Sequence, residues 1–354
     1  MPGKHIVSTN PATGQQATAH PLLYLNRADI IKLGGSTSDL YIEALQQAFL
    51  RHARGEVVQP LKPYLRAQQD SGHIADRIIA MPAYIGGEEA IAGIKWVGSK
   101  HDNPARYGWE RASALIILND PDTNYPLAVM EGGLISSMRT AALTALAARY
   151  LARVNFRTFS CIGCGLIART HLRVFLEQFP GLAMITLFDL ERSTLDSCLA
   201  EFRSSFPLIE FHAATSAEEA VGKGEVVVTC TVAAQPYLSF AWLQKGSFFS
   251  NVSLMDAHRD VFLQADKVIV DDWEQCNREK KMLHQLVQEG HFSRAQLHAE
   301  LSEIISGQRP GRETEEEIIL LNPIGLALED VACAQSIYRR ALAAQTGTWL
   351  HLYE

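Results

Sequence analysis

The sequence has no apolar run that reaches the about 20 residues needed to cross a membrane. Its first twenty residues are polar and lack the apolar core of a secretory signal, so we expect a cytoplasmic protein. It also lacks a block of basic residues, and its net charge is -7, which argues against nucleic acid as a partner. With 354 residues, 47% of them hydrophobic, the chain has a globular composition and a length that suggests two domains.

Cysteine is scarce and scattered: only Cys161 and Cys164, among six cysteines, form a CxxC pair. In a cytosolic α/β protein such a pair can signal a redox motif. Cys161 ends an apolar run and Cys164 lies between two glycines, which favours small buried residues around a tight turn. No second ligand pair follows at zinc-finger spacing, so we predict no metal centre.

The first part of the chain combines helices with short strands. A helix is predicted over residues 36–54 because its apolar residues fall on one stripe. Strands are predicted over residues 90–98, 112–118 and 127–130, and the turn-rich NDPDTNYP segment between the last two predicts an antiparallel hairpin. An alanine-rich helix over residues 134–151 would link this unit to the next.

From Thr158 onward, apolar strands alternate with helical stretches, which is typical of a parallel sheet built from β-α-β units. A further strand at residues 318–321 and a closing helix at 326–344 are expected to pack back on the first unit. The predicted strands of the parallel sheet are residues 158–162, 185–188, 225–230, 248–252 and 267–270.

The strongest local motif is Gly-x-Gly-x-x-Ala at residues 163–168, directly after a predicted strand and at the start of a predicted helix. Gly163 permits a tight turn, Gly165 lets the backbone approach a pyrophosphate, and Ala168 allows close packing of helix on strand. The next strand ends in Asp189, about twenty residues on, where a Rossmann fold places its ribose-binding acid. A carboxylate there repels a 2′-phosphate, so the motif favours NAD over NADP.

Four further segments resemble the ornithine cyclodeaminase/mu-crystallin family and occur in the family's order. The resemblance covers the chain from about Leu22 to its end. It implies an enzyme that transfers hydride between NAD and an amino-acid-derived amine. The segments are GIKWVG at 93–98, MRTAA at 138–142, NVSLMD at 251–256 and GLALED at 325–330.

Within the family, the longest local matches point to a branch of dehydrogenases from siderophore precursor synthesis. The resemblance implies oxidation of a secondary amine that joins glutamate to a diaminopropionate skeleton. Hydrolysis would then give L-2,3-diaminopropionate and 2-oxoglutarate. The segments are residues 59–66 (QPLKPYLR), 72–82 (GHIADRIIAMP), 95–104 (KWVGSKHDNP), 119–126 (NDPDTNYP) and 271–281 (DDWEQCNREKK).

Three basic residues are candidate ligands for substrate carboxylates. Lys95 has apolar neighbours and suits such a pairing, the alternative being an edge-strand lysine that faces water. The family's equivalent of Arg139 binds the substrate carboxylate, and its guanidinium fork suits that contact; the alternative is a helix-surface arginine. Arg66 is the third candidate, and Arg77 competes with it for the same role.

Asp256 and Lys95 are the candidate catalytic residues. Asp256 is the candidate for proton handling, as its equivalent is catalytic in the family. It would take the proton from the amine nitrogen or activate the water that attacks the imine. The alternative is an aspartate that only caps the next turn. Beside Gly163, Gly165 and Asp189, further cofactor contacts are expected at Thr140, Leu166, Ile167, Thr231 and Ser253.

Two departures from the family's pattern weaken a cyclodeaminase activity. Ile79 stands where ornithine cyclodeaminases carry a glutamate, two residues before the Met-Pro pair, and residues 322–325 read NPIG in place of DSVG. The rival activities are ornithine cyclodeaminase, alanine dehydrogenase and ketimine reductase. A non-enzymatic binding protein like mu-crystallin is a further alternative, against which the retention of Lys95, Arg139 and Asp256 argues.

These observations predict an α/β protein of two domains that forms a homodimer. A Rossmann-type NAD-binding domain is expected over residues 152–317. An α+β domain for substrate binding and dimerisation would comprise residues 1–151 and 318–354. Lys95, Arg139 and Asp256 are expected to meet at the carboxyl ends of the parallel strands, where such folds bind their ligands.

Overall fold

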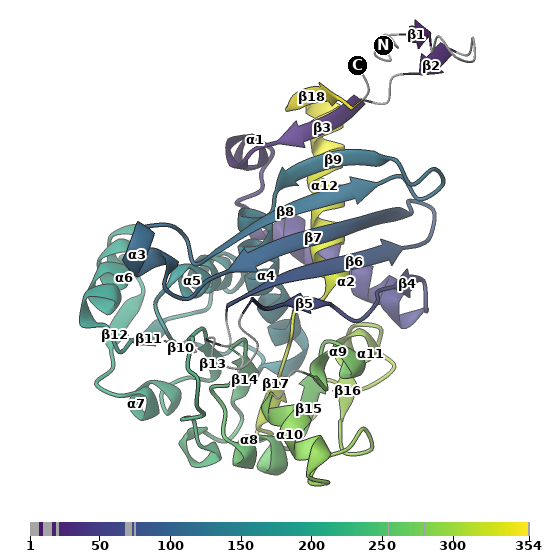
Figure 1. The fold of residues 1–354 in the computed structure, drawn as a ribbon. Helices are drawn as coiled ribbons and strands as arrows, with labels where there is room; N and C mark the ends of the chain where they lie inside the picture. The colour runs from purple at the N-terminus through teal and green to yellow at the C-terminus, as the bar shows by residue number, and fades with distance from the viewer. Residues whose placement is uncertain are drawn as a thin grey trace.

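The computed structural model describes residues 7–9, 16–18, 21–67, 73, 76–253, 255–278 and 281–352. Two large sheets, one parallel and one mixed, lie side by side with their helices (Figure 1). Two short strands near the N-terminus, β1 (Val7–Thr9) and β2 (Gln16–Thr18), pair with each other in antiparallel fashion. None of the helices in the described ranges is long and apolar enough to cross a membrane.

The second half of the chain forms the parallel sheet, as the alternation of strands and helices predicted. Its strands are β10 (Thr158–Ile162), β11 (Met184–Phe188), β12 (Glu210–Ala213), β13 (Val226–Thr229), β14 (Phe248–Asn251), β15 (Lys267–Val270), β16 (Ala299–Glu300) and β17 (Ile319–Leu321). They follow the order β12-β11-β10-β13-β14-β17-β15-β16, and every pairing is parallel. The strand pairs are therefore those of a Rossmann-like fold.

The strands of this sheet are nearly continuous apolar runs because helices cover both faces. All four residues of β13, β14 and β15 are buried. The helices are α5 (Leu166–Gln178), α6 (Arg192–Ser205), α7 (Ala217–Val221), α8 (Arg259–Gln264), α9 (Trp273–Cys276), α10 (Met282–Gln288) and α11 (Leu301–Ile305), with a 3-10 turn η1 (Phe240–Trp242).

The first part of the chain forms the mixed sheet, whose order is β18-β3-β9-β8-β7-β6-β4, with β5 also paired to β6. The predicted hairpin is confirmed, because β8 and β9 pair in antiparallel fashion. The strands are β3 (Pro21–Leu25), β4 (Val57–Val58), β5 (Tyr64–Leu65), β6 (Arg77–Ile85), β7 (Ile91–Ser99), β8 (Ala112–Asn119), β9 (Pro126–Glu131) and β18 (Thr348–His351).

No strand is predicted from the sequence at β6, where Pro82 interrupts the apolar run. The structure explains how the strand tolerates it. On one edge β6 pairs along its whole length with β7. On the other edge it pairs with β5 through Ile78 and Ile79, and with β4 through Tyr84 and Ile85. Pro82 lies in the gap between these two short strands, where a missing N–H breaks no ladder.

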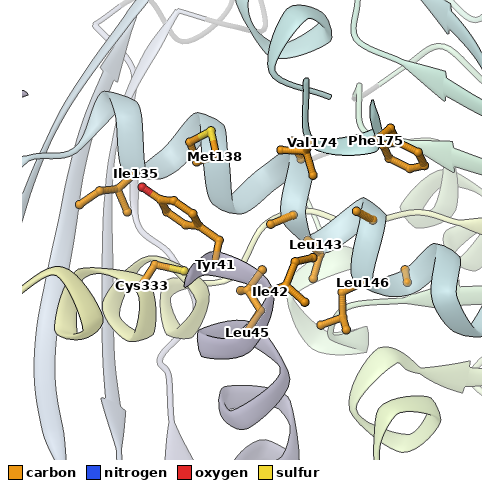
Figure 2. Packing of buried hydrophobic residues seen from close by; sticks show 14 of the residues in the cluster. Tyr41, Ile42, Leu45, Ile135, Met138, Leu143, Leu146, Val174, Phe175 and Cys333 are labelled. Atoms are coloured by element: carbon orange, nitrogen blue, oxygen red, sulfur yellow. The ribbon is translucent and has the colours of Figure 1, made fainter. Parts of the chain in front are cut away.

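Helices cover one face of the mixed sheet. They include α2 (Ser38–Ala53), α4 (Gly133–Leu151) and α12 (Ala327–Ala344), while α1 (Arg27–Lys32) and α3 (Asn103–Tyr107) are short. Helix α12 packs against β6, β7 and β8, and Figure 1 shows it behind the sheet. Helix α4 contacts α2, α12 and α5, so its buried side chains join the cores of both sheets (Figure 2).

The C-terminal segment divides between the two sheets. The prediction that residues 318–354 belong to the first unit is wrong for the strand, because β17 lies inside the parallel sheet between β14 and β15. All three residues of β17, Ile-Leu-Leu, are buried, as a central strand requires. For the closing helix α12 the prediction is confirmed by its packing on the mixed sheet. The chain therefore crosses between the sheets through residues 322–326. The other domain bounds stay predictions.

Candidate active site

The glycine loop after β10 contains one glycine packed against another backbone segment, Gly163, and one with free space around it, Gly165. Gly163 has a φ of +90°, and a Cβ there would lie 2.7 Å from the carbonyl oxygen of Cys230, so only glycine fits without strain. Gly165 begins α5 without a side-chain cap, and no atom lies within 4 Å of a Cβ added there. The first N–H groups of α5, including those of Leu166 and Ile167, have no acceptor within the helix. This arrangement fits a pyrophosphate.

The neighbouring cysteines and aspartate hold this loop in place. Cys161 and Cys164 are buried free thiols, which confirms their prediction as small packing residues. Asp189 follows β11, and its Oδ2 accepts a hydrogen bond of 2.7 Å from the N–H of Cys164. Its Oδ1 accepts one of 2.9 Å from the N–H of Glu191. The carboxylate is therefore fixed beside the glycine loop, where a ribose diol lies in Rossmann folds.

A second group of predicted residues gathers just beyond the carboxyl ends of β13 and β14. The hydroxyl of Thr231 donates to Oδ1 of Asp256 at 2.6 Å, and its N–H donates to the hydroxyl oxygen of Ser253 at 2.6 Å. Asp256 is fully buried, and its Oδ2 makes no hydrogen bond with any residue that the structure describes. One carboxylate oxygen is thus held in place and the other is left for another partner.

The surroundings of Asp256 favour its protonated form more than water does. Burial raises the pKa of Asp256, and hydrogen bonds from Thr231 and Ser253 oppose that shift. Tyr237, which sequence reasoning did not single out, lies close by, and burial together with Asp256 raises the pKa of its phenol. A carboxylate with a raised pKa and one oxygen without a hydrogen-bond partner among the described residues is suited to accept a proton.

Lys95 points from β7 toward the helices rather than toward water. Its side chain is only 2% exposed, and its Nζ lies 2.6 Å from Oδ2 of Asp330 on α12. The Nζ also donates to the hydroxyl of Ser136 at 3.2 Å. Burial lowers the pKa of Lys95 to about 8, although Asp330 raises it. The alternative of an edge-strand lysine is wrong, since β7 lies between β6 and β8.

Arg139 on α4 also contacts Asp330, together with the neighbouring Glu329. Its Nη1 donates to Oε2 of Glu329 at 2.5 Å, and its Nε donates to Oδ1 of Asp330 at 3.1 Å. Arg139 is buried, so the alternative of a helix-surface arginine is wrong. Gly325 has a φ of +73°, and a Cβ there would lie 2.6 Å from Nη1 and 2.9 Å from Nη2 of Arg139. Only glycine therefore fits against this side of the guanidinium without a clash.

Glu329 and Asp330 were part of the GLALED segment but were not named as site residues. Both are fully buried at the start of α12. Burial raises the pKa of Glu329 to about 7, and Arg139 opposes that shift. Its Oε1 has no hydrogen-bond partner within the described ranges. The GLALED motif marked this segment as similar to the family. Only the folded structure shows that Asp330 contacts both Lys95 and Arg139 and that Glu329 contacts Arg139.

The competing candidates Arg66 and Arg77 lie beside one ring. Their guanidinium carbons stand 5.2 Å and 5.5 Å from the ring centre of Tyr64. Lys62, which the sequence analysis did not single out, donates from its buried Nζ to the carbonyl oxygen of Gly325 at 2.6 Å. This contact joins the segment that carries Arg66 to the neighbourhood of Arg139.

The structure brings some of the predicted residues together and leaves others apart. Lys95 and Arg139 share Asp330, whereas neither makes a hydrogen bond or ion pair with Asp256 in the described part of the chain. Thr140 follows Arg139 on α4, and its hydroxyl donates to the carbonyl oxygen of Ser136 at 2.7 Å. A meeting of Asp256 with the two cations around a ligand therefore stays a prediction.

Comparison with known proteins gives consistent matches along the chain. It is 55% identical over 332 residues to the N-((2S)-2-amino-2-carboxyethyl)-L-glutamate dehydrogenase of Staphylococcus aureus, which covers 94% of this chain and 99% of that protein. It is 31% identical over 319 residues to the alanine dehydrogenase of Archaeoglobus fulgidus, covering 89% of this chain and 94% of that protein.

Solved structures agree in fold. The Delta(1)-pyrroline-2-carboxylate reductase of Thermococcus litoralis, in complex with NADH and L-proline, superimposes with a TM-score of 0.85 at 30% identity, covering 92% of this chain and 99% of that chain. An archaeal alanine dehydrogenase dimer with bound NAD gives a TM-score of 0.83 at 30% identity, covering 94% and 100%. The model of the ornithine cyclodeaminase/mu-crystallin family matches residues 27–345. The chain belongs to the ornithine cyclodeaminase/mu-crystallin family.

Proposed function

We propose that this protein is an NAD-dependent dehydrogenase of N-((2S)-2-amino-2-carboxyethyl)-L-glutamate. Oxidation and hydrolysis of that secondary amine yield L-2,3-diaminopropionate and 2-oxoglutarate. The observation that carries the proposal is the 55% identity to the S. aureus enzyme over 94% of this chain and 99% of that one. The relatives solved with NAD or NADH support the cofactor, as does the fit of the glycine loop and Asp189.

The site gathers buried charges of both signs. Four buried cations, Lys62, Lys95, Arg139 and Lys281, stand beside four fully buried acids, Asp256, Asp271, Glu329 and Asp330. Burial raises the pKa of Glu329 to about 7 and lowers that of Lys281 to about 7, so both charges are partly lost at neutral pH. The cations of the site are suited to bind carboxylates of a ligand.

In the proposed mechanism the chain's own residues orient the amine and handle its proton. The dinucleotide, when bound, supplies the hydride acceptor. The guanidinium of Arg139 and the Nζ of Lys95, held by Asp330, bind the carboxylate next to the reacting carbon. Asp256, with its free oxygen, takes the proton from the amine nitrogen or activates the water that attacks the imine.

Ile79 argues against a cyclodeaminase reaction. It pairs with Val97 on β7 and with Tyr64 on β5, and it packs against the hydrophobic core. A glutamate at the corresponding place in ornithine cyclodeaminases offers a carboxylate to the substrate. The isoleucine offers none.

We further propose a homodimer that forms through the outer face of the mixed sheet. Figure 1 shows α12 behind this sheet, with the front of the strands uncovered. That face exposes Tyr84, Trp96 and Leu115, and it has a hollow lined by Pro82 and Ile94 among others. Exposed apolar patches of this kind mark protein interfaces. The archaeal alanine dehydrogenase is a dimer, which supports the proposal.

The test is a substrate comparison with the purified protein. The adduct, L-ornithine, L-alanine and L-proline are each incubated with NAD, and NADH absorbance is followed while products are identified by mass spectrometry. We expect the adduct to be oxidised with the highest kcat/KM and to give both named products. Faster oxidation of L-alanine or L-proline, or conversion of L-ornithine to proline, would overturn the proposal.

A further inference from the structure

Three arginines from distant parts of the sequence surround one aromatic ring. The guanidinium carbons of Arg66, Arg77 and Arg278 lie 5.2 Å, 5.5 Å and 5.9 Å from the ring centre of Tyr64. Arg66 follows β5, Arg77 begins β6, and Arg278 follows α9 of the other sheet. The two sheets therefore contribute positive charge to the same place.

Polar contacts fix these segments against one another. Arg278 donates from Nη1 to the carbonyl oxygen of Lys62 at 3.1 Å, and Gln275 donates from Nε2 to the carbonyl oxygen of Pro60 at 3.1 Å. Gln59 donates from Nε2 to Oδ2 of Asp272 at 3.2 Å. The loop before β5 is thus anchored to the segment after β15.

Lys281 is the buried member of this group without a partner. Its side chain is 6% exposed, and it makes no hydrogen bond or ion pair with any residue in the described ranges. Burial lowers the pKa of Lys281 to about 7; the positive charges of Lys62 and Arg77 also lower it, whereas Cys276 and Asp271 raise it. Lys281 stands at the start of α10 (Met282–Gln288), three residues after Arg278, which contacts the carbonyl oxygen of Lys62.

Asp271, whose charge acts on Lys281, is already committed to other partners. Asp271 accepts hydrogen bonds at its Oδ2 from the N–H groups of Ile324 and Gly325 at 2.8 Å and 2.7 Å. Its Oδ1 accepts one from the thiol of Cys276 at 3.1 Å. A buried cation that lacks an anionic partner among the described residues is unfavourable unless another group, such as a ligand, supplies one.

We propose that Lys281, with Arg77 and Arg278, forms a second carboxylate subsite, distinct from that of Lys95 and Arg139. It holds the far end of an amine substrate that carries carboxylates at both ends. Lys62 spaces the two subsites: its Nζ contacts the carbonyl oxygen of Gly325, the glycine beside the guanidinium of Arg139. The inference deepens the proposed function and rests on it for the identity of the substrate.

The first experiment removes the cation and the carboxylate in turn. Wild type and Lys281→Met are compared with the glutamate–diaminopropionate adduct, with an analogue lacking the glutamyl γ-carboxylate, and with one lacking the diaminopropionate carboxylate. With the full adduct, kcat/KM should fall by roughly 10–100-fold, as for a lost charge-assisted hydrogen bond. With one of the two truncated amines the loss should be less than about threefold, because the carboxylate that Lys281 binds is already absent.

Two matched variants separate charge from packing. Lys281→Arg keeps the cation and should restore much of the activity, whereas Lys245→Met, at an 81% exposed side chain, should behave like wild type. Lys281→Met replaces an unpaired buried charge with an apolar side chain of similar length, so we expect its Tm to be unchanged or raised. An equal loss with all three amines would overturn the subsite.

A binding measurement keeps the subsite testable if the proposed function fails. In the presence of NADH, calorimetry compares glutarate, with two carboxylates, and butyrate, with one. Wild type should bind glutarate more tightly, and Lys281→Met should lose roughly 10–100-fold for glutarate but little for butyrate. Equal affinity of wild type for both acids would overturn the inference whatever amine the enzyme oxidises. Failure to oxidise the adduct with this selectivity intact would overturn only the proposed function.

Discussion

At the scale of single residues, burial shifts the pKa values of the groups that we propose to carry the chemistry. Asp256 is fully buried and shares one oxygen with Thr231, and burial raises its pKa. Lys95 is buried as well, yet its contact with Asp330 keeps a partner beside the ammonium. Burial therefore favours proton uptake by Asp256, whereas it makes the charged form of Lys95 dependent on an ion pair.

Replacing Asp256 by Asn tests its role in proton handling. Asn keeps the size and an oxygen for the Thr231 hydroxyl but cannot take up a proton. Turnover should fall by roughly 10²–10⁴-fold, the span for a lost acid–base group. Because the reaction needs the carboxylate form, the variant should also lose the rise of the rate with pH on the acidic side. Both are measured by steady-state kinetics across pH, with NAD affinity as the control. Turnover near that of wild type would show that Asp256 only caps a turn.

Replacing Asp189 by Ser tests the selection of NAD. The carboxylate is fixed by the N–H groups of Cys164 and Glu191 beside the glycine loop. Removing its charge should lower the preference for NAD over NADP, expressed as a ratio of kcat/KM values, by at least about tenfold, or about 1.4 kcal/mol. Asp196→Ser on the exposed side of α6 is the control. A wild type that uses NADP as well as NAD would contradict this reading of Asp189.

At the scale of elements, the ends of strands and helices position the site. The carboxyl ends of β10, β13 and β14, neighbours in the parallel sheet, carry the glycine loop, Thr231 and Asp256. The start of α12 carries Glu329 and Asp330, which hold Lys95 from β7 and Arg139 from α4. One helix thus orients cations from two other elements.

Substitution by alanine should have different effects at the two glycines that precede α5, Gly163 and Gly165. At Gly163, alanine would meet the carbonyl oxygen of Cys230 at 2.7 Å and adopt a φ of +90°. We expect it to lower the free energy of unfolding by about 1–3 kcal/mol. At Gly165, alanine meets no protein atom, so stability should change by about 0.5 kcal/mol or less.

Dinucleotide affinity separates the two variants further. Gly165→Ala should weaken NAD binding by at least about tenfold, because its Cβ occupies space through which a pyrophosphate approaches the helix. Denaturant unfolding and NADH fluorescence titration measure the two effects. Normal NAD affinity of a stable Gly165→Ala protein would show that the cofactor does not approach at this point.

At the scale of the whole molecule, the proposed dimer depends on the uncovered face of the mixed sheet. Trp96 is 46% exposed on β7, on the face opposite to Lys95. Trp96→Glu would bury an unpaired carboxylate in the proposed dimer interface, and we expect the dimer Kd to rise by about 100-fold or more. Sedimentation velocity measures the change. Leu208→Glu, at a 95% exposed site between α6 and β12, is the control. An unchanged dimer in the Trp96 variant would place the interface elsewhere.

Much of the parallel sheet could be predicted because its signals are local. Central strands such as β10 and β15 are short apolar runs between helices, and their predicted bounds match the structure. The glycine motif is local as well, since one short segment contains the turn, the close approach and the helix start. The sequence by itself therefore determined the α/β class, the family resemblance and the candidate nucleotide loop.

Tertiary structure decided the features that depend on segments far apart in the chain. Strand β6 tolerates Pro82 only because β4 and β5 leave a gap beside it, and β17 joins the parallel sheet only because β14 and β15 leave room between them. The unpaired state of Lys281 depends on packing after β15. Burial and charge pairing are properties of the folded surroundings, so no local pattern of residue types could assign them.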